Sequence, residues 1–139
     1  RAALAEVMRL AAEVNKYLDQ TSPWLNIKQD VAAAARAIFV AMKAIDSLKI
    51  LFAPFLPFTS QKLHRFMGYS GQLFGSQYVE TIKDELGEHT VLRYDPVQAS
   101  GEWKPSTLKP GDRFEKPEPL FKKLDAGIVE EERARIGKL

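Results

Sequence analysis

The chain has 139 residues and a mass of 15.7 kDa, which suits one ordinary domain. Its 45% hydrophobic and 27% charged residues are a globular balance and exclude a disordered chain. Cysteine is absent, so disulfides, thiolate zinc sites and a cysteine nucleophile are excluded. The absence suits a reducing compartment without proving one, and the location that we expect is cytoplasmic. Charged residues interrupt every apolar run before the roughly 18 residues that a membrane helix needs, so no membrane association is expected.

Charge is unevenly distributed along the chain. Residues 1–70 contain nine Lys/Arg and five Asp/Glu, whereas residues 71–139 contain eleven and thirteen. A basic first half is compatible with a polyanionic partner. The alternative, ordinary scatter of solvated surface charge, stays open.

The first predicted helix ends at Thr21-Ser22-Pro23, because a residue before proline is disfavoured in the α region. The chain starts inside this helical pattern, with no capping residue before it, so we interpret it as a piece of a longer protein. The apolar stripe of this helix consists of Leu4, Val7, Met8, Ala11, Val14 and Leu18.

A second helix is predicted from Lys28 or Asp30 to Phe52, with Asp30 as a cap or first-turn acid. Prolines then break the chain, and a short third helix is predicted from a Thr59 cap through Met67, with Gly68 at its end. Two long antiparallel helices and a short third one predict an all-α helical bundle.

The chain changes character from Tyr69 onward. We expect a short helix over Glu80–Leu86, a short strand over Val91–Tyr94, and a type II turn at Pro110-Gly111. One more helix is predicted over Asp125–Leu139. The expected fold is thus a helical core (1–68), a variable connection with an irregular, small β extension (69–115), and a closing tail with a C-terminal helix (116–139), all in one domain.

Catalytic and metal-binding patterns are not found. The two histidines, His64 and His89, have no metal-ligand spacing around them, and His64 is expected to be a surface or capping residue. The sequence also has no phosphate loop, nucleophile elbow or carboxylate pair. We therefore predict no catalytic residue and no metal site.

Trp24 lies on the predicted turn after Pro23 and outside any periodic stripe. Its ring is either a hydrophobic plug against the next helix or a stacking platform for an unpaired base. Asn15 would add an amide able to donate and accept, and Lys16 and Lys28 flank the turn as possible phosphate contacts.

Three segments resemble the methionyl-tRNA synthetase family, in the helical anticodon-binding domain shared by class Ia aminoacyl-tRNA synthetases. Residues 15–24 read NKYLDQTSPW and resemble the family's N-(R/K)-Y-x-(D/E)-x-x-x-P-W motif. Residues 51–59, LFAPFLPFT, and residues 116–125, KPEPLFKKLD, resemble its proline segment and its closing tail. The connection 69–115 resembles the family least.

The resemblance implies that Trp24 stacks on the anticodon loop and helps to select the CAU anticodon, with Pro23 shaping the turn and Asn15 and Lys16 on the same motif. It implies a methionine-accepting tRNA as partner. The intact enzyme would use ATP and Mg²⁺ to attach methionine through a catalytic domain upstream, together with the first helix of the anticodon-binding domain. This chain itself would hold no cofactor and would be inactive alone. Leu120, Phe121 and Leu124 of the tail are expected to form a structural plug.

Two alternatives remain. In the first alternative, the chain is a helical protein-interaction module that docks a partner through the Leu4 and Met8 face of its first helix. In the second, it is the anticodon-binding domain of another class Ia synthetase.

Overall fold

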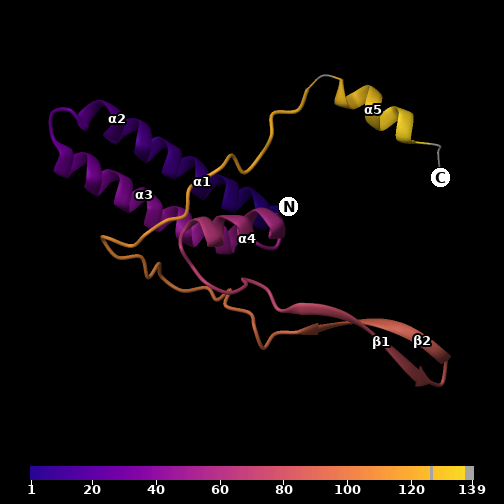
Figure 1. The fold of residues 1–139 in the computed structure, drawn as a ribbon. Helices are drawn as coiled ribbons and strands as arrows, with labels where there is room; N and C mark the ends of the chain where they lie inside the picture. The colour runs from indigo at the N-terminus through magenta and orange to yellow at the C-terminus, as the bar shows by residue number, and fades with distance from the viewer. Residues whose placement is uncertain (126, 137–139) are drawn as a thin grey trace.

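The computed structural model describes residues 1–125 and 127–136. It is mainly helical with one small two-stranded sheet, as the sequence predicts (Figure 1). In chain order, the elements are α1 (Ala2–Thr21), α2 (Pro23–Asn26), α3 (Val31–Phe52), α4 (Pro57–Phe66), β1 (Ser76–Asp84), β2 (Gly87–Asp95) and α5 (Ile128–Arg135).

Helices α1 and α3 lie side by side in opposite directions and form the core (Figure 1). Val7 of α1 is buried, and α3 contributes Ala34, Ala37 and Ala41 at three- and four-residue spacing. These small side chains let the two helices approach closely. The predicted cap is confirmed, because the Ala33 backbone N–H donates a 2.8 Å hydrogen bond to Asp30 Oδ1.

Helix α4 begins earlier than predicted. It starts at Pro57 with Leu56 as its N-cap, so Thr59 lies inside the helix and does not cap it. Proline is well suited to a first helical turn, because its missing N–H would have no partner there. Gly68 ends this segment with φ of +80°, as predicted.

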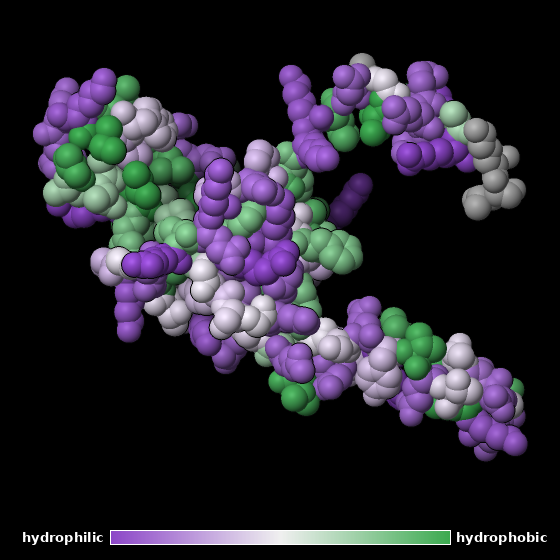
Figure 2. Space-filling model, viewed as in Figure 1, coloured by the Kyte–Doolittle hydropathy of each residue, from purple (hydrophilic) through white to green (hydrophobic). Residues whose placement is uncertain are grey.

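The hairpin of β1 and β2 corrects one prediction and confirms another. Glu80–Leu86 was predicted to be a short helix but lies mostly in β1, whereas Val91–Tyr94 is strand, within β2. Cross-strand pairing explains the strand: Val79 faces Leu92 and Thr81 faces Thr90 in an antiparallel register, and the β-branched Val79, Thr81 and Thr90 favour strands. The hairpin projects from the bundle as an exposed arm (Figure 2).

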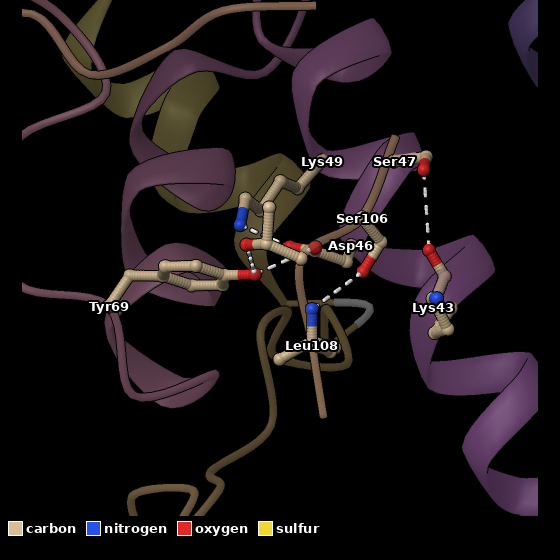
Figure 3. A network of polar contacts seen from close by, with 8 residues as sticks. Lys43, Asp46, Ser47, Lys49, Tyr69, Ser106 and Leu108 are labelled. Carbon is tan, nitrogen blue, oxygen red and sulfur yellow. Dashed lines mark hydrogen bonds and ion pairs between the residues drawn. The ribbon is translucent and has the colours of Figure 1, made fainter. Parts of the chain in front are cut away.

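A buried polar cluster joins α3 to the connection that follows α4 (Figure 3). Asp46 and Lys49 of α3 form a buried ion pair. The Tyr69 hydroxyl donates a 2.8 Å hydrogen bond to Asp46 Oδ2, and Lys49 Nζ lies 3.7 Å from the centre of the Tyr69 ring. Burial acts to raise the pKa of Asp46, but hydrogen bonds from Lys49, Ser106 and Tyr69 outweigh it, so this pKa lies below its ordinary value.

His64 belongs to the same cluster, which contradicts its predicted surface or capping position. It is 4% exposed, and its ring stacks on Tyr69 with centroids 4.9 Å apart. Burial, reinforced by the charge of Lys49, lowers the pKa of His64. Among the described residues, neither of its ring nitrogens has a hydrogen-bond partner. The residue is buried because the connection after α4 folds back over it, which its own helix does not reveal.

The tail returns to α4 after the predicted turn. Gly111 has φ of +95°, and the Asp112 N–H donates to the Lys109 carbonyl at 3.2 Å, as a turn at Pro110-Gly111 requires. The Glu115 N–H then donates to the Phe66 carbonyl at 2.9 Å. The Arg113 carbonyl passes so close to Gly68 that a Cβ there would lie 2.3 Å from its oxygen.

Of the three predicted plug residues, only Leu120 is half-buried. It lines an apolar groove of about 320 Å³ together with side chains of α1, α3 and α4, whereas Phe121, which borders the same groove, and Leu124 are exposed. Helix α5 is shorter than the predicted 125–139, and residues 126 and 137–139 of that prediction lie outside the described residues. None of the described helices combines the length and apolar character needed to cross a membrane.

Candidate nucleic-acid interface

The corner between α1 and α2 is built around a proline. Pro23 has no N–H, so it offers no donor to the Asp19 carbonyl four residues earlier. The Ser22 hydroxyl donates to that carbonyl instead, at 2.6 Å. Ser22 adopts the left-handed conformation with φ of 38°, and no other non-glycine residue in the described ranges has a positive φ. The chain therefore turns sharply here without leaving that carbonyl unpaired.

Further hydrogen bonds fix α2 onto the end of α1. The Asn26 side-chain amide donates to the Thr21 carbonyl at 2.8 Å, and the backbone N–H groups of Leu25 and Asn26 donate to the Ser22 carbonyl at 2.9 and 3.1 Å. Sequence reasoning missed Ser22 and Asn26. A serine directly before a proline and an asparagine three residues after it are the signals that could have found them.

Trp24 lies on α2 and is 56% exposed, while Pro23 beside it is buried. The plug interpretation of this indole is therefore wrong, and the ring is presented to solvent. Leu25, Ile27 and Val31 are also exposed, so further apolar side chains are accessible at this end of the helical pair (Figure 2). A flat, accessible aromatic ring on a fixed backbone is suited to stacking.

The other predicted site residues surround the corner at different distances. Lys28 is exposed on the turn that joins α2 to α3. Asn15 and Lys16 are exposed on α1, and Asn15 precedes Ser22 by about 10 Å of helix axis at roughly 1.5 Å per residue. Asn15 makes no side-chain hydrogen bond to any described residue, whereas the Asn26 amide holds the turn through its bond to the Thr21 carbonyl.

The charges of the corner balance. Residues 15–31 contain Lys16 and Lys28 against Asp19 and Asp30, and Asp30 is engaged as the cap of α3. The corner is thus an apolar surface with two positive and two negative charges, and it is not strongly basic. Within the described residues, no group of three or more His, Asp or Glu side chains could hold a metal ion. The arrangement offers stacking, amide hydrogen bonding and two cations.

The chain matches a known protein family and a set of curated proteins. A family model described as the anticodon binding domain of methionyl tRNA ligase matches residues 1–93, which are more than half of the chain and include the whole corner. No solved structure matches the chain.

Curated relatives match almost the whole chain. The methionine–tRNA ligase of Thermomicrobium roseum is 51% identical over 138 residues, and that of Chloroflexus aggregans is 47% identical over 137 residues. The ligase of Thermobifida fusca is 34% identical over 142 residues. Each match covers 98% of this chain and 23–24% of the relative, so the chain spans about a quarter of these proteins. Taken with the family match, this shows that the chain belongs to the anticodon-binding domains of methionyl-tRNA ligases.

Proposed function

We propose that the α1–α2 corner binds a tRNA anticodon loop by stacking an unpaired base on Trp24. The observation that carries this proposal is the 56% exposure of an indole whose backbone is fixed by the Ser22 and Asn26 hydrogen bonds. Stacking a base on an aromatic side chain contributes about 1–3 kcal/mol and needs little charge, which suits a corner whose charges balance. A ring already held in place also loses little freedom on binding.

The neighbouring residues have separate roles in this proposal. Pro23 holds the turn, and Lys28 contacts a phosphate next to the stacked base. Lys16 contacts a second phosphate further along α1, where Asn15 presents its amide to an adjacent nucleotide. The ligand is the CAU anticodon of a methionine-accepting tRNA.

The chain acts as one part of a methionine–tRNA ligase in this proposal. The intact ligase attaches methionine to tRNA with ATP and Mg²⁺, in the cytoplasm, and a catalytic domain upstream supplies the chemistry. The present chain supplies recognition, in keeping with its match to about a quarter of the relatives.

Fluorescence of a single indole tests the proposal. The chain has two tryptophans, and Trp103→Phe leaves Trp24 as the sole indole. Titration of this variant with a CAU anticodon stem-loop should quench its emission, whereas a stem-loop with a scrambled loop should quench it far less. Trp24→Ala should lower the affinity for the CAU stem-loop at least about fivefold. Its circular dichroism should stay unchanged, because the ring is exposed.

Leu25→Ala is the matched control, since Leu25 is an exposed apolar neighbour on the same short helix. Equal quenching by both stem-loops would contradict recognition of the anticodon by Trp24. Preference for a different anticodon would point to another class Ia synthetase. Binding of no RNA at all would favour a protein-interaction module, for which the exposed Leu4 and Met8 of α1 offer an apolar face.

A further inference from the structure

A second surface with the composition of a nucleotide site lies at the far end of α3 from Trp24. This groove of about 680 Å³ lies between α4 and the base of the β-hairpin, and we call it the α4–hairpin groove. The side chains that matter for its chemistry are Phe58, Arg65, Gln72, Phe74, Gln77 and Tyr94.

Hydrogen bonds hold the two walls of the groove together. Gln61 of α4 accepts the Leu73 N–H at 2.7 Å through Oε1 and donates to the Gly71 carbonyl at 3.4 Å through Nε2. The Tyr94 hydroxyl accepts the Gly75 N–H at 2.7 Å. The loop between α4 and β1 is thereby tied to α4 and to β2, and the groove has a defined shape.

Four side chains of the groove are exposed to solvent: Phe58, Arg65, Gln72 and Gln77. Phe58 is 89% exposed, an unusual position for a phenylalanine on a short helix. Among the described residues, the side chains of Arg65, Gln72 and Gln77 have neither a hydrogen-bond nor an ion-pair partner. An exposed aromatic ring, a free guanidinium and free amides in one groove provide stacking, a phosphate contact and base-edge hydrogen bonds.

The charges favour binding of a polyanion in the α4–hairpin groove but disfavour it along the β-hairpin. No carboxylate lines the groove, and Arg65 is its charged residue. The hairpin residues 76–95, in contrast, contain five Asp/Glu and two Lys/Arg, so the arm beyond the groove repels nucleic acid.

We infer that the α4–hairpin groove binds an unpaired nucleotide of the same tRNA, outside its anticodon loop, with the base stacked on Phe58 and a phosphate on Arg65. This inference rests on the proposed function. The two surfaces lie at opposite ends of α3 (Figure 1), a helix of 22 residues that spans about 33 Å at 1.5 Å per residue. One loop cannot fill both surfaces, so the groove contacts a separate part of the tRNA.

Two variants compared on two RNAs test the inference. Phe58→Ala and Arg65→Ala, made in the full chain, are titrated with a complete CAU tRNA transcript and with its isolated anticodon stem-loop. Each variant should weaken binding of the complete tRNA at least about fivefold and leave stem-loop binding unchanged. Leu86→Ala is the matched control for Phe58→Ala, because Leu86 is equally exposed (88%) but lies at the hairpin tip, outside the groove.

The failure of this inference is distinguishable from failure of the anticodon site. If both groove variants bind complete tRNA as tightly as the original chain does, the groove is not a tRNA site, whatever Trp24→Ala does. An equal loss of affinity for the complete tRNA and for the stem-loop would also overturn the inference, since the groove would then contact no part of the tRNA outside the stem-loop. If Trp24→Ala has no effect while Phe58→Ala lowers only the affinity for the complete tRNA, the inference about the groove is supported and the proposed anticodon site is wrong. Thermal unfolding of each variant confirms that the comparison is made on folded protein.

Discussion

The side-chain amide of Asn26 donates a 2.8 Å hydrogen bond to the carbonyl of Thr21, which ties α2 back onto the last turn of α1. Together with the bond from the Ser22 hydroxyl to the Asp19 carbonyl, it replaces helix hydrogen bonding at the point where Pro23 prevents it. The orientation of Trp24 therefore depends on two polar side chains that contact no ligand in the proposed complex. This relationship leads to the first prediction.

Asn26→Ala should loosen the corner without unfolding the bundle. Loss of one partly solvated hydrogen bond should lower the free energy of unfolding by about 1 kcal/mol, measured by urea denaturation. Affinity for the CAU stem-loop should fall several-fold, because Trp24 would no longer be held in place before binding. Gln29→Ala serves as control, since Gln29 is an exposed neighbour whose side chain has no hydrogen-bond partner among the described residues. Unchanged affinity of Asn26→Ala would show that the indole does not need this bond.

Binding of the stem-loop should depend only weakly on salt. Each phosphate contact with a single strand contributes a slope of about −0.7 to the plot of log affinity against log salt, and the corner offers two lysines. We expect a slope no steeper than about −1.4, becoming shallower by about 0.7 in either Lys16→Ala or Lys28→Ala. Lys83→Ala, on the hairpin, should leave the slope unchanged. A much steeper slope in the original chain would mean that the RNA lies elsewhere.

Asp30→Asn separates capping from charge at the corner. Asparagine caps helices as well as aspartate does, so the free energy of unfolding should change little, whereas Asp30→Ala should lower it by about 1 kcal/mol. Removal of one negative charge near Lys28 should tighten stem-loop binding in Asp30→Asn. Binding titrations and chemical denaturation of the two variants side by side check both statements. Weaker RNA binding by a well-folded Asp30→Asn variant would contradict the proposed location of the phosphates.

The buried His64 should make stability depend on pH. Its pKa is lowered in the folded protein, chiefly by burial and by the charge of Lys49, with the Tyr69 ring and Asp46 as its other neighbours. As the pH falls below the ordinary histidine value of about 6.5, the unfolded chain binds a proton that the folded chain does not, so stability is lost. Above that pH both states are neutral at this residue, and the effect vanishes.

His64→Phe tests this dependence, because phenylalanine keeps a planar ring against Tyr69 and cannot titrate. Its unfolding temperature should vary less between pH 5 and 7.5 than that of the original chain. Asp46, whose pKa is lowered, loses its stabilising charge only in more acidic solution, so it does not mask the comparison. His89→Gln, on the hairpin, is the control. A pH profile unchanged by His64→Phe would show that another group is responsible.

Local chemistry explains which parts of this structure the sequence predicts. Asp30 caps α3 and Phe52 ends it, and both bounds follow from residues within a few positions of the helix end. The hairpin was harder to predict, because Glu80–Asp84 becomes a strand only by pairing with Gly87–Val91 across the turn at Glu85 and Leu86. Long-range contact likewise decides His64, which segments more than thirty residues later help to enclose.

In the candidate site, too, the sequence predicts what local chemistry sets and not what depends on the folded backbone. Pro23 and Trp24 are conspicuous in the sequence, but whether the indole is a plug or a platform depends on how α2 leaves α1. That exit is set by Ser22 and Asn26, whose roles arise only once the carbonyls of Asp19 and Thr21 lack helical donors. The groove beside Phe58 could not be predicted at all, since its walls come from α4, a loop and both strands.

Gly68 lets the returning tail pack closely against the end of α4. The main chain at Arg113 crosses it with no room for even a methyl group, at a backbone angle that only glycine adopts freely. A side chain at this crossing would push the returning tail away from α4 and leave the α1–α3 pair intact. In Gly68→Ala, the tail should therefore detach from the bundle before the α1–α3 pair unfolds. Thermal unfolding would then show two transitions, the first of which reports on the tail alone.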